Sequence, residues 1–171
     1  VMAVDCALKT GERNDYTAVT TWGVGLNAIY LLDAWHAKLE YTDVVKHLIA
    51  LYARFRPREL LVEDCNTGHM VRQYLMENSM IPAIARKIDR MSKENRADVV
   101  LPLIESGRVF LPENAPWLGE YLHELEAFGH GRHDDYVDST VIALRRIGES
   151  SASGMFTWSR PYHVARTRWS F

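Results

Sequence analysis

Apolar and β-branched residues form three runs in the first part of the chain, and each run predicts a strand. The runs cover residues 1–7, 16–23 and 29–39. The segments between them contain Gly, Asn and Asp, which are typical of turns. This order of runs and turns predicts an antiparallel three-stranded meander at the start of the fold.

The spacing of apolar residues becomes helical after residue 40. A helix is expected over residues 41–55, ended by Pro57, and residues 59–63 then form an apolar run typical of a buried parallel strand. The further expected elements are helices over residues 66–76, 92–106, 117–128 and 134–147 and strands over 81–88 and 109–111. Antiparallel strands followed by parallel crossovers predict an α/β fold with a mixed sheet and helices on both faces.

The end of the chain differs in composition from the rest. Residues 1–149 are expected to form one domain and residues 150–171 a C-terminal linker and tail, because residues 150–154 read Ser-Ser-Ala-Ser-Gly. The tail is aromatic and basic without a clear period, and is either a docking segment or an ordinary disordered terminus. Since the chain begins inside an apolar run, we expect it to be a domain of a longer protein.

Composition narrows the classes of function. Of the 171 residues 47% are hydrophobic, which allows a sizeable core, and a net charge of −2 argues against a general nucleic-acid coat protein. A nuclease remains compatible with this charge, because acidic metal ligands offset basic DNA contacts. No signal peptide or membrane-length apolar run is found, so an intracellular protein is expected. The isolated Cys6 and Cys65 are expected to be buried thiols in a reducing compartment.

Acidic residues interrupt or adjoin three apolar segments. Asp5 and Glu63 lie within predicted strands, where a carboxylate is costly unless it is neutralised. A helical crossover can place these strands side by side, with both acids pointing to one face. The helix that starts at Asp134 can pack on that face and contribute its own acids. Such oxygen ligands suit Mg²⁺ or Mn²⁺, and two ions about 3.5–4 Å apart can promote phosphodiester hydrolysis.

Each acidic segment also has a structural interpretation. Asp5 could end its strand, Glu63 could lead into a helix cap, and Asp134 and Asp135 could cap the last helix and interact with its dipole. Asp138 lies one turn into that helix and borders its apolar face, which favours a shared site. From the residues alone the third primary ligand is Asp134, Asp135 or Asp138.

Two further features concern ligands and DNA. His133 is either a hydrogen-bond partner of a metal ligand or phosphate, or an ordinary cap or surface residue, and no second Cys or His pair supports zinc. The basic segment over residues 86–96 joins a strand to a helix start, which suits phosphate binding, although a solvated loop is equally compatible. The residues expected to bind DNA are Lys87, Arg90, Lys93 and Arg96, with Lys9 and Arg13 as further candidates.

Five motifs in this order resemble the nuclease domain of the large terminase subunit of tailed bacteriophages. They are Asp5, Asp15-Tyr16-Thr17-Ala18, Val62-Glu63-Asp64 followed by Gly68, Gly107-Arg108-Val109-Phe110-Leu111-Pro112, and His133-Asp134-Asp135-Tyr136-Val137-Asp138-Ser139. The resemblance extends over residues 1–147. The last motif is its most specific part.

The resemblance implies an RNase H-like (RuvC-like) fold and a metal-dependent endonuclease that cuts concatemeric double-stranded viral DNA during genome packaging. It implies Asp5, Glu63 and Asp135 as catalytic metal ligands, Asp138 as an auxiliary ligand, and Mg²⁺ or Mn²⁺, with two ions expected. It further implies an ATPase motor domain in the same polypeptide, the portal protein and small terminase subunit as partners, and the bacterial host cytoplasm as location. This chain has no phosphate-loop motif of its own. Alternatives are a Holliday-junction resolvase or transposase-like nuclease of this fold, or a non-catalytic nucleic-acid-binding module.

Overall fold

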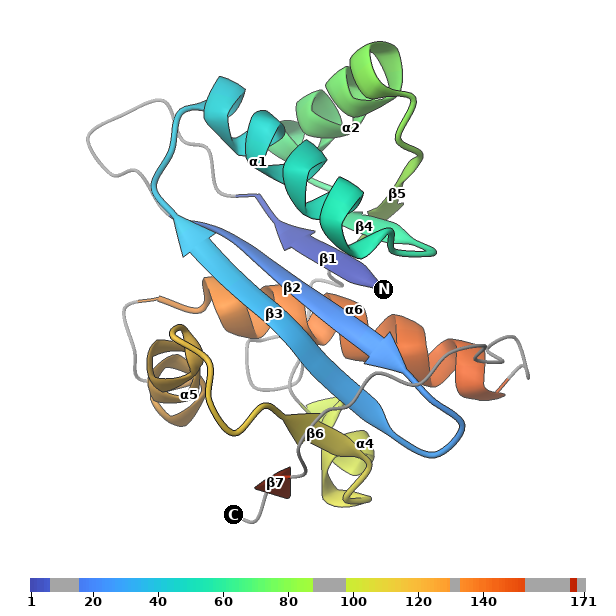
Figure 1. Ribbon diagram of the computed structural model, residues 1–171, viewed down its shortest axis with the longest axis vertical. Helices are drawn as coiled ribbons and strands as arrows, with labels where there is room; N and C mark the ends of the chain where they lie inside the picture. The colour runs from blue at the N-terminus through green and yellow to red at the C-terminus, as the bar shows by residue number, and fades with distance from the viewer. Residues whose placement is uncertain (7–15, 88–97, 130–132, 153–166, 169–171) are drawn as a thin grey trace.

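A seven-stranded sheet forms the centre of the protein (Figure 1). The computed structural model describes residues 1–6, 16–87, 98–129, 133–152 and 167–168. The strands are β1 (Met2–Asp5), β2 (Thr17–Val24), β3 (Ile29–Ala37), β4 (Leu60–Glu63), β5 (Ala83–Arg86), β6 (Val109–Leu111) and β7 (Thr167–Arg168), in the spatial order β5-β4-β1-β2-β3-β6-β7. The helices are α1 (Tyr41–Phe55), α2 (Asn66–Ser79), α4 (Leu101–Glu105), α5 (Leu118–Glu126) and α6 (Asp135–Ala152).

Strand pairing confirms the predicted meander and the parallel strands that follow it. β1 pairs antiparallel with β2, and β2 pairs antiparallel with β3. β4 returns beside β1 in parallel, with Val4 opposite Val62, and β5 extends the sheet in parallel beyond β4. On the other side β6 runs parallel to β3, and β7 pairs with β6. The first strand is therefore central, with the fourth beside it.

Helices cover both faces of this sheet, as predicted. α1 and α2 lie on one face, over a core that includes Met2, Val4 and Val62. α6 and the smaller helices α4 and α5 lie on the other, over a core that includes Ala3 and Leu61 (Figure 1). Because successive strand residues point to opposite faces, one strand supplies both cores. This alternation also decides the direction of every polar residue at a strand end.

Helix α6 extends farther than the sequence pattern indicates. The pattern predicts an end at Ile147 and a linker from Ser150, whereas α6 continues through Ala152. Ser150 is fully buried and its hydroxyl donates a hydrogen bond to the carbonyl of Arg146. Serine can satisfy its hydroxyl within a helix in this way, so a serine-rich sequence need not end a helix that packs against a sheet.

Other element boundaries shift by a few residues. The strand expected over residues 81–88 is Ala83–Arg86, and the helix expected over 117–128 is Leu118–Glu126. Of the helix expected over 92–106, residues 92–97 lie outside the described part, and α4 occupies only Leu101–Glu105. From the tail, Thr167–Arg168 form β7.

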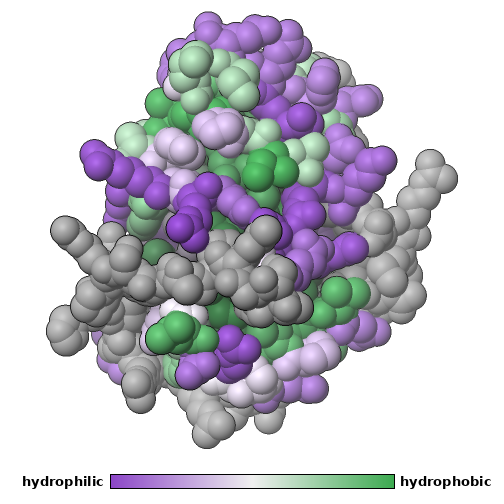
Figure 2. Space-filling view, turned by 90° about the vertical axis from the view of Figure 1, so that its right-hand side faces the viewer, coloured by the Kyte–Doolittle hydropathy of each residue, from purple (hydrophilic) through white to green (hydrophobic). Residues whose placement is uncertain are grey.

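Polar side chains cover much of the surface. Figure 2 shows hydrophilic residues over most of the upper part of one face, surrounding separate hydrophobic areas. Among the described residues no helix is both long and apolar enough to cross a membrane.

Candidate active site

Asp5 and Glu63 come together at the carboxyl ends of two adjacent parallel strands. Ala3 and Leu61 both belong to the core under α6, and each acid lies two residues farther along the same strand. Both carboxyl groups therefore point to the α6 face. Burial raises the pKa of Asp5, and the Glu63 side chain raises it further, as expected when both carboxyl groups point to the same face of the sheet. This placement is the one predicted from the sequence.

The start of α6 brings further carboxyl groups to the same place. Asp135 is 7% exposed and Asp138 is half-buried. Burial raises the pKa of Asp5 well above its usual range, and the neighbouring charges of Glu63, Asp138 and Asp135 raise it further. Three acids from β4 and α6 thus act electrostatically on Asp5 of β1.

Asp134 lies differently from the other acids of its motif. Its backbone carbonyl accepts a 2.8 Å hydrogen bond from the backbone N–H of Asp138, which forms the first turn of α6. The charge of Asp134 acts on Glu124, where it contributes to a raised pKa. Of the three candidates for the third ligand, the charges of Asp135 and Asp138 act on Asp5.

Glu124 of α5 holds the N-terminus of α6, a role that sequence reasoning missed. Its Oε1 atom accepts hydrogen bonds from the backbone N–H groups of Tyr136 (2.6 Å) and Val137 (3.1 Å), and the residue is 8% exposed. Burial raises the pKa of this carboxyl to about 7, although the two backbone hydrogen bonds oppose that rise. Helix caps normally come from the residue just before the helix, so no local sequence signal marks this partner.

Aromatic rings border the acids on the β2 and β3 side. Tyr16 stacks on His36 with ring centroids 4.5 Å apart, and His36 stacks on Tyr136 at 4.3 Å. His133 meets Tyr16 edge-on at 5.1 Å, and its Nδ1 lies 3.7 Å from Asp135 Oδ2. His133 is therefore adjacent to a candidate ligand, which is one of the two positions considered for it from the sequence.

The acidic group has donor chemistry suited to a hard divalent cation. Carboxylate oxygens from three elements match the preferences of Mg²⁺ and Mn²⁺. A divalent cation bound there would relieve the mutual repulsion of these carboxylates, which contributes to the raised pKa of Asp5. Among the described residues, no three Asp, Glu, His or Cys side chains are positioned as ligands of one ion.

The end of β4 is followed at once by α2, whose first turn includes Cys65 and Gly68. Cys65 is the N-cap of α2, and its Sγ accepts a hydrogen bond from the backbone N–H of Gly68 at 3.3 Å. Cys6 is buried as predicted, but Cys65 is half-exposed because β4 ends at Glu63. The Cys65 thiol also donates to the carbonyl of Cys6 at 3.6 Å, so this sulfur connects the start of α2 to the residue after β1.

Gly68 permits the close approach of α2 to β4. A Cβ atom at this position would lie 2.0 Å from the backbone oxygen of Glu63, which cannot move aside as a flexible side chain can. We expect Gly68→Ala to lower the free energy of unfolding by about 1–3 kcal/mol, as overpacking does, and to weaken metal binding by displacing Glu63.

Gly148→Ala is the matched control for this substitution, measured by denaturant unfolding. A Cβ there meets nothing within 4 Å in α6, and alanine should stabilise the helix by about 0.5–1 kcal/mol. Equal stability of the two variants would contradict the close contact at Gly68.

The basic segment predicted to bind DNA is described only in part. Lys87 is exposed and directly follows β5, whose last residue, Arg86, pairs in register with Glu63. Arg86 itself is held by Glu149 of α6, with Nη2 and Oε2 2.6 Å apart. The remaining candidates Arg90, Lys93, Arg96, Lys9 and Arg13 lie outside the described residues. Lys87 thus occupies the same edge of the sheet as the acids.

Comparisons with known structures agree with this architecture. The large terminase of a thermophilic bacteriophage shares the fold at a TM-score of 0.60 and 10% identity, over 85% of this chain and 39% of that one. The large terminase nuclease of thermophilic phage G20c matches with a TM-score of 0.56 and 17% identity, over 83% of this chain and 78% of that one. Thermus thermophilus RuvC, solved with a Holliday-junction substrate, gives 0.52 at 12% identity, over 90% and 95%. The chain spans well under half of the first of these terminases. No curated protein sequence matches it.

The fold is that of the RNase H-like class, a mixed sheet with helices on both faces. The chain belongs to the family described as the Terminase RNaseH-like domain, whose sequence model matches residues 2–146. The match covers all the acids of the site and both helical layers. This confirms the family and the fold that the sequence motifs suggested.

Proposed function

We propose that this protein is a metal-dependent endonuclease that cuts concatemeric double-stranded viral DNA during genome packaging. One observation carries the proposal. Asp5, Glu63, Asp135 and Asp138 interact electrostatically at the carboxyl ends of the central strands, within a terminase nuclease-like fold. A group of four acids, of which Asp5 and Asp135 are buried, is unfavourable for stability alone, and a divalent cation would neutralise it.

Asp5, Glu63 and Asp135 are the proposed primary ligands, with Asp138 as an auxiliary ligand. The proposed cofactor is Mg²⁺ or Mn²⁺, and we expect two ions, which when bound would activate water and stabilise the leaving oxygen. The chain positions these ligands through two strand ends and one helix start. Glu124 orients the helix start by accepting from the N–H groups of Tyr136 and Val137.

The remaining partners follow from the family. As part of a large terminase, the domain would act in the bacterial host cytoplasm on DNA supplied by an ATPase motor domain of the same polypeptide. The portal protein and the small terminase subunit are the other proposed partners.

The proposed DNA contacts beside β5 are Lys87, Arg90, Lys93 and Arg96. Reversing the charge of Lys87, Arg90 and Lys93 should weaken DNA binding and flatten its salt dependence, since each phosphate contact contributes about 0.9 to the slope of log K against log salt. Binding of a labelled duplex over a salt series measures this. An unchanged affinity and slope would remove the segment from the interface.

A plasmid-nicking assay with Mn²⁺ tests the proposed function, with EDTA as the metal-free control. Similarity to RuvC favours a Holliday-junction resolvase as the second candidate, so a four-way junction is assayed beside linear duplex. Cleavage of duplex without preference for the junction supports the terminase activity, and selective junction cleavage supports the resolvase. Absence of nicking with Mn²⁺ and, in a parallel assay, with Mg²⁺ would indicate a non-catalytic binding module.

A further inference from the structure

Lys38 lies at the same edge of the sheet as the acids, on the side away from Lys87. It is exposed and follows β3 directly, as Lys87 follows β5. In the strand order β5-β4-β1-β2-β3, Glu63 and Asp5 lie on the strands between them. The acids are therefore flanked by one lysine on each side, across the ends of five strands.

Lys38 is oriented by its neighbours. Its Nζ atom lies over the Tyr16 ring, 4.7 Å from the centroid, in a cation–π contact. The ring is itself fixed by stacking on His36 and by the edge of His133, the residue beside Asp135. The ammonium group is thus held on the rim of the acidic site by a rigid aromatic support that reaches to a proposed metal ligand.

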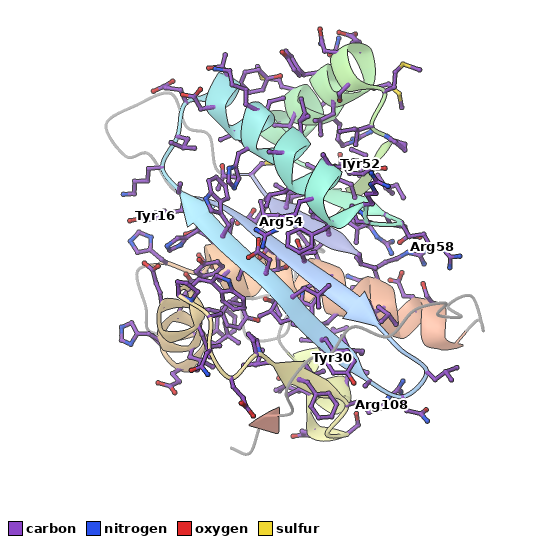
Figure 3. All side chains as sticks on the ribbon, viewed as in Figure 1. Tyr16, Tyr30, Tyr52, Arg54, Arg58 and Arg108 are labelled. Carbon is purple, nitrogen blue, oxygen red and sulfur yellow. The ribbon has the colours of Figure 1, made fainter. Side chains whose placement is uncertain are left out.

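Other cations are less suited to this place. Figure 3 shows Tyr16 at the end of the sheet toward which β3 points, whereas Arg58 and Arg108 lie toward the opposite end. Arg72 of α2 is held by Asp64, with Nη1 and Oδ1 3.9 Å apart, and by the carbonyl of Ala83. Among the described residues, Lys38 and Lys87 are the lysines at the acidic edge.

We infer that Lys38, supported by Tyr16, binds a DNA phosphate on the β3 side of the cleaved bond. The inference rests on the proposed function and adds a second contact opposite the predicted one at Lys87. β3 and β5, which Lys38 and Lys87 follow, are separated by four inter-strand spacings in the sheet, so their ends lie about 19 Å apart. At about 3.4 Å of rise per base pair, a duplex along this edge would present phosphates about five to six base pairs apart to the two lysines. The cleaved phosphate would then lie between them, over Asp5 and Glu63.

Lys38→Ala and Lys46→Ala form the matched pair for the test. Lys46 is also an exposed lysine, on α1 across the sheet from α6, where it pairs with Asp43 at 3.0 Å. Binding of a labelled duplex to the 171-residue chain is measured in EDTA over a salt series. Lys38→Ala is expected to lower affinity roughly tenfold and to reduce the salt slope by about 0.9, the value for one phosphate contact. Lys46→Ala should change neither.

Tyr16 is a positioning residue in this proposal, and the conservative variant separates its role from a structural one. Tyr16→Phe keeps the ring and should bind DNA like the wild type, whereas Tyr16→Leu should weaken binding at an unchanged melting temperature. Equal salt dependence of DNA binding in Lys38→Ala and Lys46→Ala would overturn the inference. The proposed function would be unaffected by that result as long as cleavage still depends on Asp5. If cleavage persists in Asp5→Asn, the proposed function fails independently of Lys38.

Discussion

Replacing Asp5 by asparagine is expected to abolish Mn²⁺-dependent cleavage and, at the same time, to raise the melting temperature of the metal-free chain. The amide keeps the shape of the side chain and can hydrogen-bond to Glu63, but it carries no charge beside the other acids. A lost metal ligand should reduce cleavage by at least about three orders of magnitude, because transition-state charge stabilisation contributes several kcal/mol.

The effect on stability follows from the raised pKa of Asp5. A group whose pKa is higher in the folded chain stabilises the fold below its unfolded pKa, and this contribution is lost as the pH rises through the folded pKa. In EDTA, ionisation of Asp5 should therefore lower the free energy of unfolding of the wild-type chain as the pH rises. Asp5→Asn should not show this loss. The two unfolding curves should diverge above the ordinary pKa of an aspartate.

Thermal unfolding with and without Mn²⁺ provides a readout independent of cleavage. Saturation of the wild-type site at about 100 times its Kd would add about 2.7 kcal/mol to stability, and Asp5→Asn and Asp135→Asn should lose most of this gain. Asp43→Asn serves as the control, because Asp43 lies exposed on α1 and pairs with Lys46. Full cleavage in both site variants would show that the acids do not form the catalytic centre.

Replacing Glu124 by alanine is expected to destabilise the start of α6 more than any exposed acid would. Two buried backbone N–H groups would lose their acceptor, each at a cost of about 1–3 kcal/mol. Asp135 and Asp138 depend on this helix start for their position, so cleavage and metal affinity should fall together. Denaturant unfolding measures the loss of stability, and Mn²⁺ titration measures the loss of metal affinity.

Glu124→Gln separates the role of the acceptor oxygen from that of the charge. Its amide oxygen can accept both N–H groups, so stability and metal binding should remain close to those of the wild type at mildly acidic pH. Burial raises the pKa of Glu124 to about 7 from an ordinary value near 4.5. The wild type should therefore lose stability relative to Glu124→Gln as the pH rises from about 4.5 to about 7. If Glu124→Ala is as stable as Glu124→Gln, the cap contributes little.

Much of the site was predictable because its strand residues obey a local rule. Alternation along residues 1–7 and 59–63 is enough to point Asp5 and Glu63 to one face once the strands are parallel neighbours. The acids of α6 were less predictable, because residues at a helix start need not follow helical phase. The structure puts the charges of both Asp135 and Asp138 beside Asp5, while the backbone of Asp134 completes the first turn.

By itself the sequence determined the order of strands and helices, the two-sided core and the family, because these depend on periodicity and on motifs in a fixed order. The tertiary structure decided the rest, namely the Glu124 cap, the extension of α6 to Ala152 and the position of Lys38 over Tyr16. Each of these depends on contacts between segments separated along the chain, which leave no periodic trace in either segment. Packing of α5 and α6 creates the first two, and the pairing of Thr17 with Ala37 in β2 and β3 brings Tyr16 and Lys38 together.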